Sequence, residues 1–354
     1  MRRKITMLFL LLLCVLTVLV ACADNKEVVE SEEETSHEES EQQTKEQEPE
    51  ESEPELKNSY PFTGEKTNDE VNDRAVAVMI NNDPKARPQS GLSKADVVYE
   101  FLIESNVTRF LAVFQSEKPD KVGPVRSARP YFYETAKGLG AIYVHHGAAT
   151  KYENVLKAGY IDRLSGMIYD NDGHLFKRED FRVAPHNSYL LFDGVYEKAK
   201  QKGYETTAQH SSLPFKEADQ VNEMAGQVIE EVSFNYSSIP VRYVYDTAKQ
   251  KYLRFNGEEQ TVEYDANEPI LLDNVFIIET KHEIVDSVGH KGIDLKSGGN
   301  ALLLQNGKMQ KLQWKNIDGR ILPVKNGEEV GFVPGKTWVN VIPTSPGLDA
   351  VTTN

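Results

Sequence analysis

Cysteine is almost absent from this chain of 354 residues, which holds only Cys14 and Cys22. Both lie within the first 22 residues, so the rest of the chain can form neither a disulfide nor a zinc site built from thiolates. A basic stripe is also lacking, and we therefore expect no binding of nucleic acid. Beyond residue 22 no second apolar run reaches the length needed to span a bilayer.

The one long apolar run lies at the start of the chain. Basic residues at 2–4 precede an apolar stretch over 7–20, and Leu19-Val20-Ala21-Cys22 places a small residue directly before a cysteine. This pattern predicts a lipoprotein signal peptide over residues 1–22, with Cys22 as the lipidated amino terminus. Cys14 follows the bulky Leu13 and fits such processing poorly. The expected partner is a membrane, with the protein lipid-anchored on the outer side of the cell membrane.

A transmembrane helix is the alternative for this stretch, because about 20 apolar residues can span a bilayer. The run here is shorter, and no stop-transfer cluster of Lys or Arg follows it. The next residues are Ala23, Asp24 and a long acidic tract. The sequence therefore favours the lipid anchor.

The acidic charge is concentrated behind the predicted anchor. The formal charge of the chain is -15, yet residues 23–59 alone hold fifteen Asp or Glu against three Lys. With +3 in the signal segment, the chain from Tyr60 onward carries only -6. Residues 23–59 are rich in Glu, Ser, Gln and Pro, which predicts a disordered linker that can reach on the order of 100 Å when well extended.

The pattern after the linker predicts an α/β domain over residues 60–207. Apolar strands are expected at 75–80, 95–102, 108–114 and 141–145, and helices at 129–139, 149–157 and 193–202. Residues 208–227 are polar and contain Pro214, which is typical of a segment between domains.

The pattern changes to short alternating strands from residue 228 onward. Their joints are Asn256-Gly257, Asn306-Gly307, Asp318-Gly319 and Asn326-Gly327, dipeptides that are strong signals for tight hairpins. The sequence predicts a mainly antiparallel β domain over 228–346 and a tail over 347–354.

Four polar segments of the first domain are the candidates for a binding site. They lie at 81–92, 122–130, 143–147 and 170–187, and the second contains Arg126 and Arg129 beside the start of a predicted helix. Guanidinium groups and free backbone N–H groups at a helix start suit a carboxylate or a phosphate. The predicted ligand-binding residues are Arg87, Arg109, Arg126, Arg129, His145, His146, Arg182, His186 and Asn187. The alternative is that Arg126 and Arg129 form internal ion pairs with Glu100, Glu104 or Asp96.

A metal or another cofactor is not expected, because the histidines follow no diagnostic spacing. The candidates for a metal site are His146, His174 and His186, together with an aspartate. His145 and His146 are neighbours at the end of a strand, so their rings are expected to point to opposite faces. Such a pair does not readily chelate one ion.

Hydrolysis is the remaining catalytic hypothesis. Glu100 and Glu104 are candidate acids for glycan cleavage, which needs two carboxylates at a defined separation. His146 is a further catalytic candidate. The sequence leaves open whether the protein is an enzyme.

Several motifs together resemble one family. They are Ala-Arg-Pro-Gln-Ser-Gly-Leu from Ala86, Val-Gly-Pro-Val-Arg-Ser-Ala-Arg-Pro from Val122, Ala-Pro-His-Asn from Ala184 and Pro-Gly-Lys-Thr-Trp-Val from Pro334. Together with the lipobox, Leu19-Val20-Ala21-Cys22, and with His-His-Gly from His145, they make the chain similar to the YerB-like lipoproteins of Gram-positive bacteria. The resemblance covers nearly everything after the linker and implies two family domains. The family has no established function, so it implies no catalytic residues.

The expected function is that of a binding or scaffolding lipoprotein at the interface of membrane and cell wall. The α/β domain would present a polar cleft to an anionic wall ligand or to a membrane protein partner. The alternative is a hydrolase of wall glycan or peptide, with or without a metal.

Overall fold

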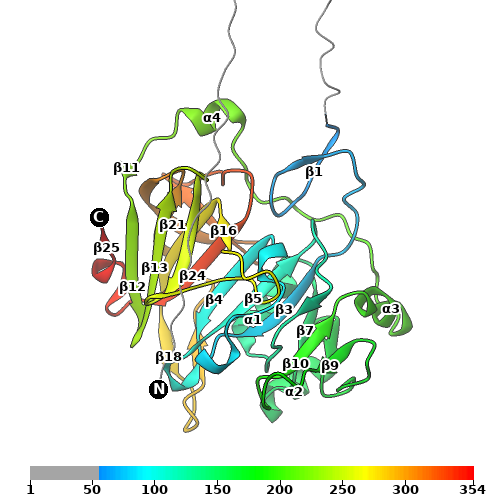
Figure 1. Ribbon diagram of the computed structural model, residues 1–354. Helices are drawn as coiled ribbons and strands as arrows, with labels where there is room; N and C mark the ends of the chain where they lie inside the picture. The colour runs from blue at the N-terminus through cyan, green and yellow to red at the C-terminus, as the bar shows by residue number, and fades with distance from the viewer. Residues whose placement is uncertain (1–55) are drawn as a thin grey trace, which may run out of the picture. The chain divides into compact units, whose positions relative to one another are not determined.

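The strands at the centre of the molecule are apolar on both faces and are therefore buried on both faces. Val76–Asn81 and Val97–Leu102 are buried at every position, and Thr337–Pro343 is buried at all but its last. The computed structural model describes residues 56–354 (Figure 1). The predicted signal peptide, Cys22 and nearly all of the predicted linker lie outside the described residues.

These strands belong to one large mixed sheet, the main sheet. Its order is β23 (Glu328–Glu329), β22 (Arg320–Lys325), β21 (Lys308–Ile317), β20 (Gly299–Gln305), β17 (Asn274–Thr280), β24 (Thr337–Pro343), β4 (Val97–Leu102), β5 (Thr108–Phe114), β3 (Val76–Asn81), β7 (Ile142–His145) and β8 (Arg163–Ser165), with β11 (Gln227–Val228) on β21.

The smaller sheets surround it. The second sheet runs β15 (Glu259–Gln260), β14 (Lys251–Asn256), β13 (Ile239–Asp246), β12 (Glu231–Tyr236) and β25 (Thr352–Thr353), with β16 (Leu271–Leu272) on β14. A third runs β6 (Lys121–Val122), β10 (Ser188–Leu191) and β9 (Phe176–Arg178), and two-stranded pairs join β1 (Asn58–Ser59) to β2 (Lys66–Thr67) and β18 (His282–Ile284) to β19 (Lys291–Ile293).

Among residues 56–354 the helices are short. The α-helices are α1 (Pro130–Gly138), α2 (Thr150–Lys157), α3 (Gly194–Gln201) and α4 (Ala218–Asn222), and the 3₁₀ turns are η1 (Pro84–Ala86), η2 (Leu92–Lys94), η3 (Glu104–Asn106) and η4 (Gly347–Ala350). The first three α-helices lie where the sequence predicted helices. The predicted α/β class needs correction, however, because β4, β5 and β3 pair antiparallel and the described part is mostly β.

Each face of the main sheet has its own apolar core. On one face, Val78 and Val275 share a cluster with Phe234 and Tyr243 of the second sheet. On the other face, Met79 belongs to a cluster that includes side chains of α1 and α2. The main sheet is thus the middle layer of the described part.

The four predicted hairpin joints are all found. Asn306-Gly307, Asp318-Gly319 and Asn326-Gly327 form two-residue turns in which both residues have positive φ, as such turns require. Asn256 ends β14, and Gly257, also at positive φ, begins the turn to β15.

Strand β24 joins the two predicted domains into one sheet. It lies between β17 and β4 and is parallel to both, with Asn340 opposite Ile277 on one side and Glu100 on the other. The strands predicted for separate α/β and β domains therefore share the main sheet. One edge of this sheet, here called the carboxyl edge, is where β3, β4, β7, β8, β17 and β24 all end.

A buried ion pair fastens the second sheet to the main sheet. Glu100 on β4 and Arg254 on β14 are both fully buried, and Arg254 Nη2 lies 2.9 Å from each carboxylate oxygen. Thr108 Oγ1 and Trp338 Nε1 donate to the same carboxylate at 2.8 and 3.0 Å. Although burial opposes it, Glu100 raises the pKa of Arg254. Both charges are therefore neutralised and hydrogen-bonded inside the core.

Removing one partner of this pair should be costly. We expect Arg254→Met to lower the free energy of unfolding by about 3–5 kcal/mol, because it leaves the Glu100 charge buried and unpaired. The double variant Glu100→Gln with Arg254→Met should recover much of that loss. Urea unfolding of both variants measures the difference.

Arg242→Met is the matched control, because Arg242 pairs with Glu231 at 3.0 Å in a partly exposed position. Its cost should stay below about 1 kcal/mol. An equal loss in the Arg242 and Arg254 variants would contradict the role assigned to the buried pair.

Candidate functional site

Residues from all four predicted polar segments meet at the carboxyl edge. Asn81 Nδ2, at the end of β3, donates to His186 Nδ1 at 2.8 Å. Arg126 Nη1 lies 3.4 Å from the carbonyl oxygen of Pro185, and the backbone N–H of Ala128 donates to Gly147 at 2.9 Å. The segments that sequence analysis singled out separately thus form one region.

The backbone of residues 124–128 is held from both sides. On one side, Asn81 N donates to Pro124 O at 2.9 Å and Arg126 N donates to Met79 O at 3.0 Å. On the other side, His146 N donates to Arg126 O at 2.9 Å. Arg129 follows directly before α1, which begins with a proline. These bonds fix the backbone positions from which the side chains of Arg126 and Arg129 extend.

Three guanidinium groups come close together here. Arg109, near the start of β5, is only 5% exposed, and its Nη1 donates to Ser127 O at 2.8 Å. Burial, together with the positive charges of Arg129 and Arg126, lowers the pKa of Arg109 to about 9. We call Arg109, Arg126 and Arg129 the arginine cluster.

Glu104 neutralises one member of the cluster. Its Oε2 accepts from Arg129 Nε at 3.1 Å, and its Oε1 accepts from Nη2 of the same arginine. Although burial opposes it, this pairing lowers the pKa of Glu104. The alternative of internal ion pairing therefore holds for Arg129. Within residues 56–354, no other carboxylate forms an ion pair with the arginine cluster.

The cluster retains donors without acceptors. Nε of Arg109 and Nε of Arg126 are buried, and neither has a hydrogen-bond partner within the described part of the chain. A buried donor without a partner costs on the order of 1–3 kcal/mol. An incoming oxyanion could relieve this cost and the excess of positive charge together.

His145, also predicted as a ligand residue, has internal partners on both ring nitrogens. It is fully buried, its Nδ1 lies 2.9 Å from Gly147 O, and Arg163 Nη1 lies 3.0 Å from its Nε2. Because the guanidinium can only donate, Nε2 accepts and Nδ1 carries the proton. Burial lowers the pKa of His145 to about 3. It is a neutral structural histidine.

The other predicted histidines have separate partners. His146 Nδ1 lies 2.7 Å from Ser188 Oγ, on the face opposite to His145, as the strand geometry predicted. His174 Nε2 lies 3.1 Å from Glu197 Oε2. Burial lowers the pKa of both His146 and His186. Within the described residues, no group of three His, Cys, Asp or Glu side chains could hold a metal ion.

Three further predicted ligand residues make internal contacts. Arg87 pairs with Glu259 at 2.9 Å, Arg182 Nη1 donates to Lys85 O at 2.9 Å, and Asn187 Oδ1 accepts from Arg178 at 2.9 Å. These bonds brace the loops around the arginine cluster.

Both carboxylates proposed for glycan cleavage form ion pairs with arginines. Glu100 is fully buried, and both of its oxygens accept hydrogen bonds from Arg254. Glu104 is held by Arg129. Burial of Glu100 leaves it no access to a glycan, so its candidacy as a catalytic acid is not supported.

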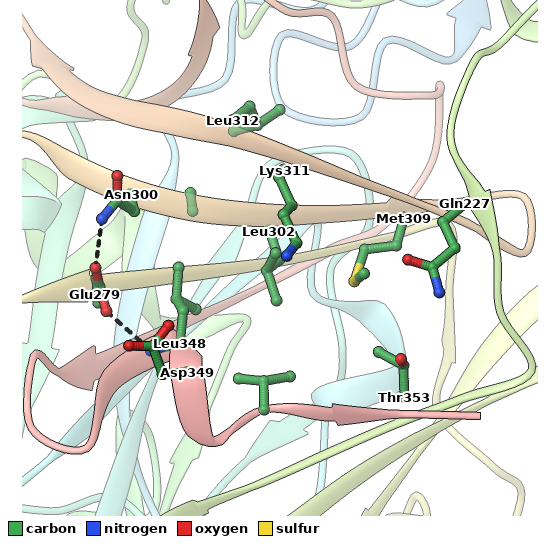
Figure 2. A pocket seen from close by; sticks show the side chains of 12 residues that line it. Gln227, Glu279, Asn300, Leu302, Met309, Lys311, Leu312, Leu348, Asp349 and Thr353 are labelled. Atoms are coloured by element: carbon green, nitrogen blue, oxygen red, sulfur yellow. Dashed lines mark hydrogen bonds between the residues drawn. The ribbon is translucent and has the colours of Figure 1, made fainter.

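A pocket of about 320 Å³ lies on a different part of the main sheet (Figure 2). Leu302, Met309 and Lys311 of β20 and β21 line it, opposite the C-terminal segment that holds Asp349. Glu279 accepts from Asn300 Nδ2 at 2.7 Å and from the backbone N–H of Leu348 at 2.9 Å. None of the predicted site residues lines this pocket.

Two residues with structural roles, Glu263 and Arg254, were not predicted from the sequence. Glu263 accepts from Gly91 N at 2.7 Å and from Ser93 N at 3.0 Å, so a residue of the later part of the chain holds a loop of the earlier part. Arg254 pairs with Glu100. Its signal was its place on the inward face of an alternating strand, two residues after Tyr252.

Two domain models of one protein family match this chain. The model described as "Protein of unknown function (DUF3048) N-terminal domain" matches residues 62–205, and the C-terminal domain model of the same family matches residues 231–339. The chain belongs to this family. The two matches correspond to the two stretches that β24 joins.

One relative is "Putative lipoprotein YerB" of Bacillus subtilis (strain 168). It is 44% identical over 293 residues, which cover 82% of this chain and 87% of the relative. The crystal structure of YerB from Bacillus subtilis matches with a TM-score of 0.77 at 42% identity, over 84% of this chain and all of that chain. The predicted family resemblance is confirmed.

The relative's name is that of a lipoprotein, which agrees with membrane attachment through a lipid. Within residues 56–354, no helix combines the length and the apolar character needed to cross a membrane.

The buried neutral His145 should make folding sensitive to acid. Its folded pKa of about 3 lies below its ordinary value of 6.5, so only the unfolded chain takes up this proton as the pH falls. Its contribution to stability is full above pH 6.5 and is lost toward pH 3, at up to about 1.4 kcal/mol per pH unit. Urea unfolding between pH 7 and 4 should show a shallower decline in His145→Gln.

His282 acts in the same direction, because burial lowers its pKa to about 4, so part of the decline should remain. His174→Gln, at an exposed ion pair, is the control and should retain the full decline. Identical pH profiles for His145→Gln and the unchanged protein would contradict the assignment.

Proposed function

We propose that this protein is a lipid-anchored lipoprotein whose body binds an anionic group outside the cell. Cys22 carries the anchor, and residues 23–59 separate the body from the lipid surface. The lipobox sequence and the lipoprotein name of a relative with 44% identity support the anchor.

The arginine cluster is the binding site in this proposal, and the single observation that carries it is an imbalance of charge. Three guanidinium groups lie together with two carboxylates, Glu104, which pairs with Arg129, and Asp83, whose charge acts on Arg126, so positive charge is in excess. Structural arginines in a core are normally neutralised, as Arg254 is by Glu100. The contrast between these two sites favours a ligand.

The ligand class is an oxyanion, either a phosphate or a carboxylate. Guanidinium groups present planar pairs of donors that match both. Ser127 and the half-buried Arg126 lie at the accessible side of the cluster, whereas Arg109 and Arg129 lie deeper. Arg126 is therefore the residue that an incoming anion should meet first.

Titration calorimetry can test the site with two soluble probes, glycerol 3-phosphate and muropeptides released from purified cell wall. Arg126→Gln should weaken binding of the recognised probe by about 10- to 100-fold, because hydrogen bonds to a charged group contribute about 1.5–3 kcal/mol. Arg109→Lys, which keeps the charge, should weaken it less than Arg109→Gln.

Arg242→Gln removes an arginine from an ion pair on the second sheet and is the matched control. Its affinity for the probe should equal that of the unchanged protein. The proposal fails if neither probe binds, or if Arg126→Gln and Arg242→Gln bind equally well.

A further inference from the structure

Exposed apolar side chains are concentrated on three loops of this protein. Within residues 56–354, eleven large hydrophobic side chains are exposed, and seven of them lie on these loops. They are Met167, Ile168, Phe181, Val183, Ile284, Val285 and Val288, with exposed fractions from 42% to 83%. Single exposed aliphatic residues are common on protein surfaces, but a concentration of this kind marks an interaction site.

All three loops lie at the carboxyl edge, around the arginine cluster. Residues 166–168 follow the end of β8, and Met167 lies beside Gly147. Residues 179–187 reach the cluster through His186 and Pro185, which contact Asn81 and Arg126. The hairpin of β18 and β19 begins directly after β17 and extends beyond the sheet (Figure 1).

The hairpin is fixed in place against the segment that leads from the cluster. Lys151 Nζ at the start of α2 lies 2.6 Å from Asp286 Oδ2, and the ring of Tyr152 packs against His290. Ala128, beside Arg129, forms a bridge with Ala148 just before α2. The hairpin tip therefore has a defined position next to the cluster.

The acidic side chains of these loops are mostly neutralised internally. Asp286 pairs with Lys151 and His290, Glu283 pairs with Lys281 at 2.8 Å, and Asp170 pairs with Arg178 at 2.8 Å. The charge of Asp83 also acts on Arg126, so three guanidinium groups lie beside two carboxylates, Glu104 and Asp83, and an excess of positive charge remains in the arginine cluster.

We infer, building on the anion site proposed above, that the carboxyl edge docks on the surface of an anionic phospholipid bilayer. The aliphatic loop tips enter the interfacial region, and a lipid phosphate occupies the arginine cluster. Apolar burial and electrostatic attraction to anionic lipid are the two contributions that hold proteins at such interfaces.

The composition of the tips favours a lipid surface over a protein partner. Six of the seven side chains are aliphatic and project from separate loops, and none is Trp or Tyr. Hot spots of protein interfaces are enriched in Trp and Tyr and are packed into one central patch. Separate aliphatic tips around recessed guanidinium groups suit a fluid surface that supplies phosphates.

The predicted linker is long enough for this orientation. The chain enters the described part through β1, and the nearby Thr63 accepts from Gly335, just before β24, so this entry lies at the end opposite to the carboxyl edge (Figure 1). Docking on the anchoring membrane requires the linker to pass along the body. A reach on the order of 100 Å exceeds the roughly 20 Å length of the strands in between.

Vesicle sedimentation with residues 23–354, made without the lipid, tests the inference. The vesicles are phosphatidylcholine alone or phosphatidylcholine with one third phosphatidylglycerol. The unchanged chain should bind the anionic vesicles, and Ile284→Asn with Val288→Asn should weaken binding by about tenfold or more, because two aliphatic side chains lose their burial. Val228→Asn alters an exposed valine on β11 and should bind normally.

Two readouts separate this inference from the proposed anion site. The Ile284 and Val288 variant should bind glycerol 3-phosphate as well as the unchanged chain does, and Arg126→Gln should lose the preference for anionic vesicles. Absence of vesicle binding with intact glycerol 3-phosphate binding would overturn the docking but not the anion site. Vesicle binding that is unaffected by the tip substitutions would also overturn it and leave this edge to a protein partner.

Discussion

The Glu100–Arg254 ion pair is the contact on which the arrangement of the whole body depends. Glu100 lies on a strand of the N-terminal family domain, and Arg254 lies on a strand of the C-terminal one. Neither charge could remain buried without the other, because desolvation of a lone ion costs several kcal/mol. The two domains must therefore fold onto each other. Once they do, all six strands that end at the carboxyl edge lie in one sheet.

Strand β24 completes this union. Its Trp338 donates to Glu100, and its Asn340 bonds to Tyr243 of the second sheet, so one strand has hydrogen bonds to both sheets. The charges of the centre are thereby paired, although Nε of Arg254, like Nε of Arg109 and of Arg126, has no partner within residues 56–354. The centre and the carboxyl edge therefore differ in the balance of charge, because Arg254 has its own carboxylate whereas Arg109 lies beside two other arginines.

Local patterns in the sequence predicted local structure well. The strands at 75–80 and 108–114 and the tight turns at Asn306-Gly307 and Asp318-Gly319 depend on neighbouring residues, and the structure contains them. The pairing of β24 with β4 joins residues more than two hundred positions apart, and no local pattern specifies it. The predicted fold class was therefore right only in part: the second stretch is mainly antiparallel β as predicted, whereas the first is not clearly α/β, because strand content was readable and strand order was not. The arginines were found as candidates, but the burial of His145 and Glu100 needed the tertiary structure.

Two buried arginines, Arg254 and Arg109, differ in how their positive charge is compensated. Arg254 and Arg109 are almost equally hidden from solvent, yet Glu100 raises the pKa of the first, while burial and two neighbouring arginines lower the pKa of the second. A fold that neutralises the charge of one guanidinium and leaves the other beside like charges keeps unfavourable electrostatic energy at one place. The anion proposed to bind there would recover that energy, so part of its affinity would come from the fold itself. This is preorganisation, since the donors are already desolvated and held by the backbone of residues 124–128 before any ligand arrives.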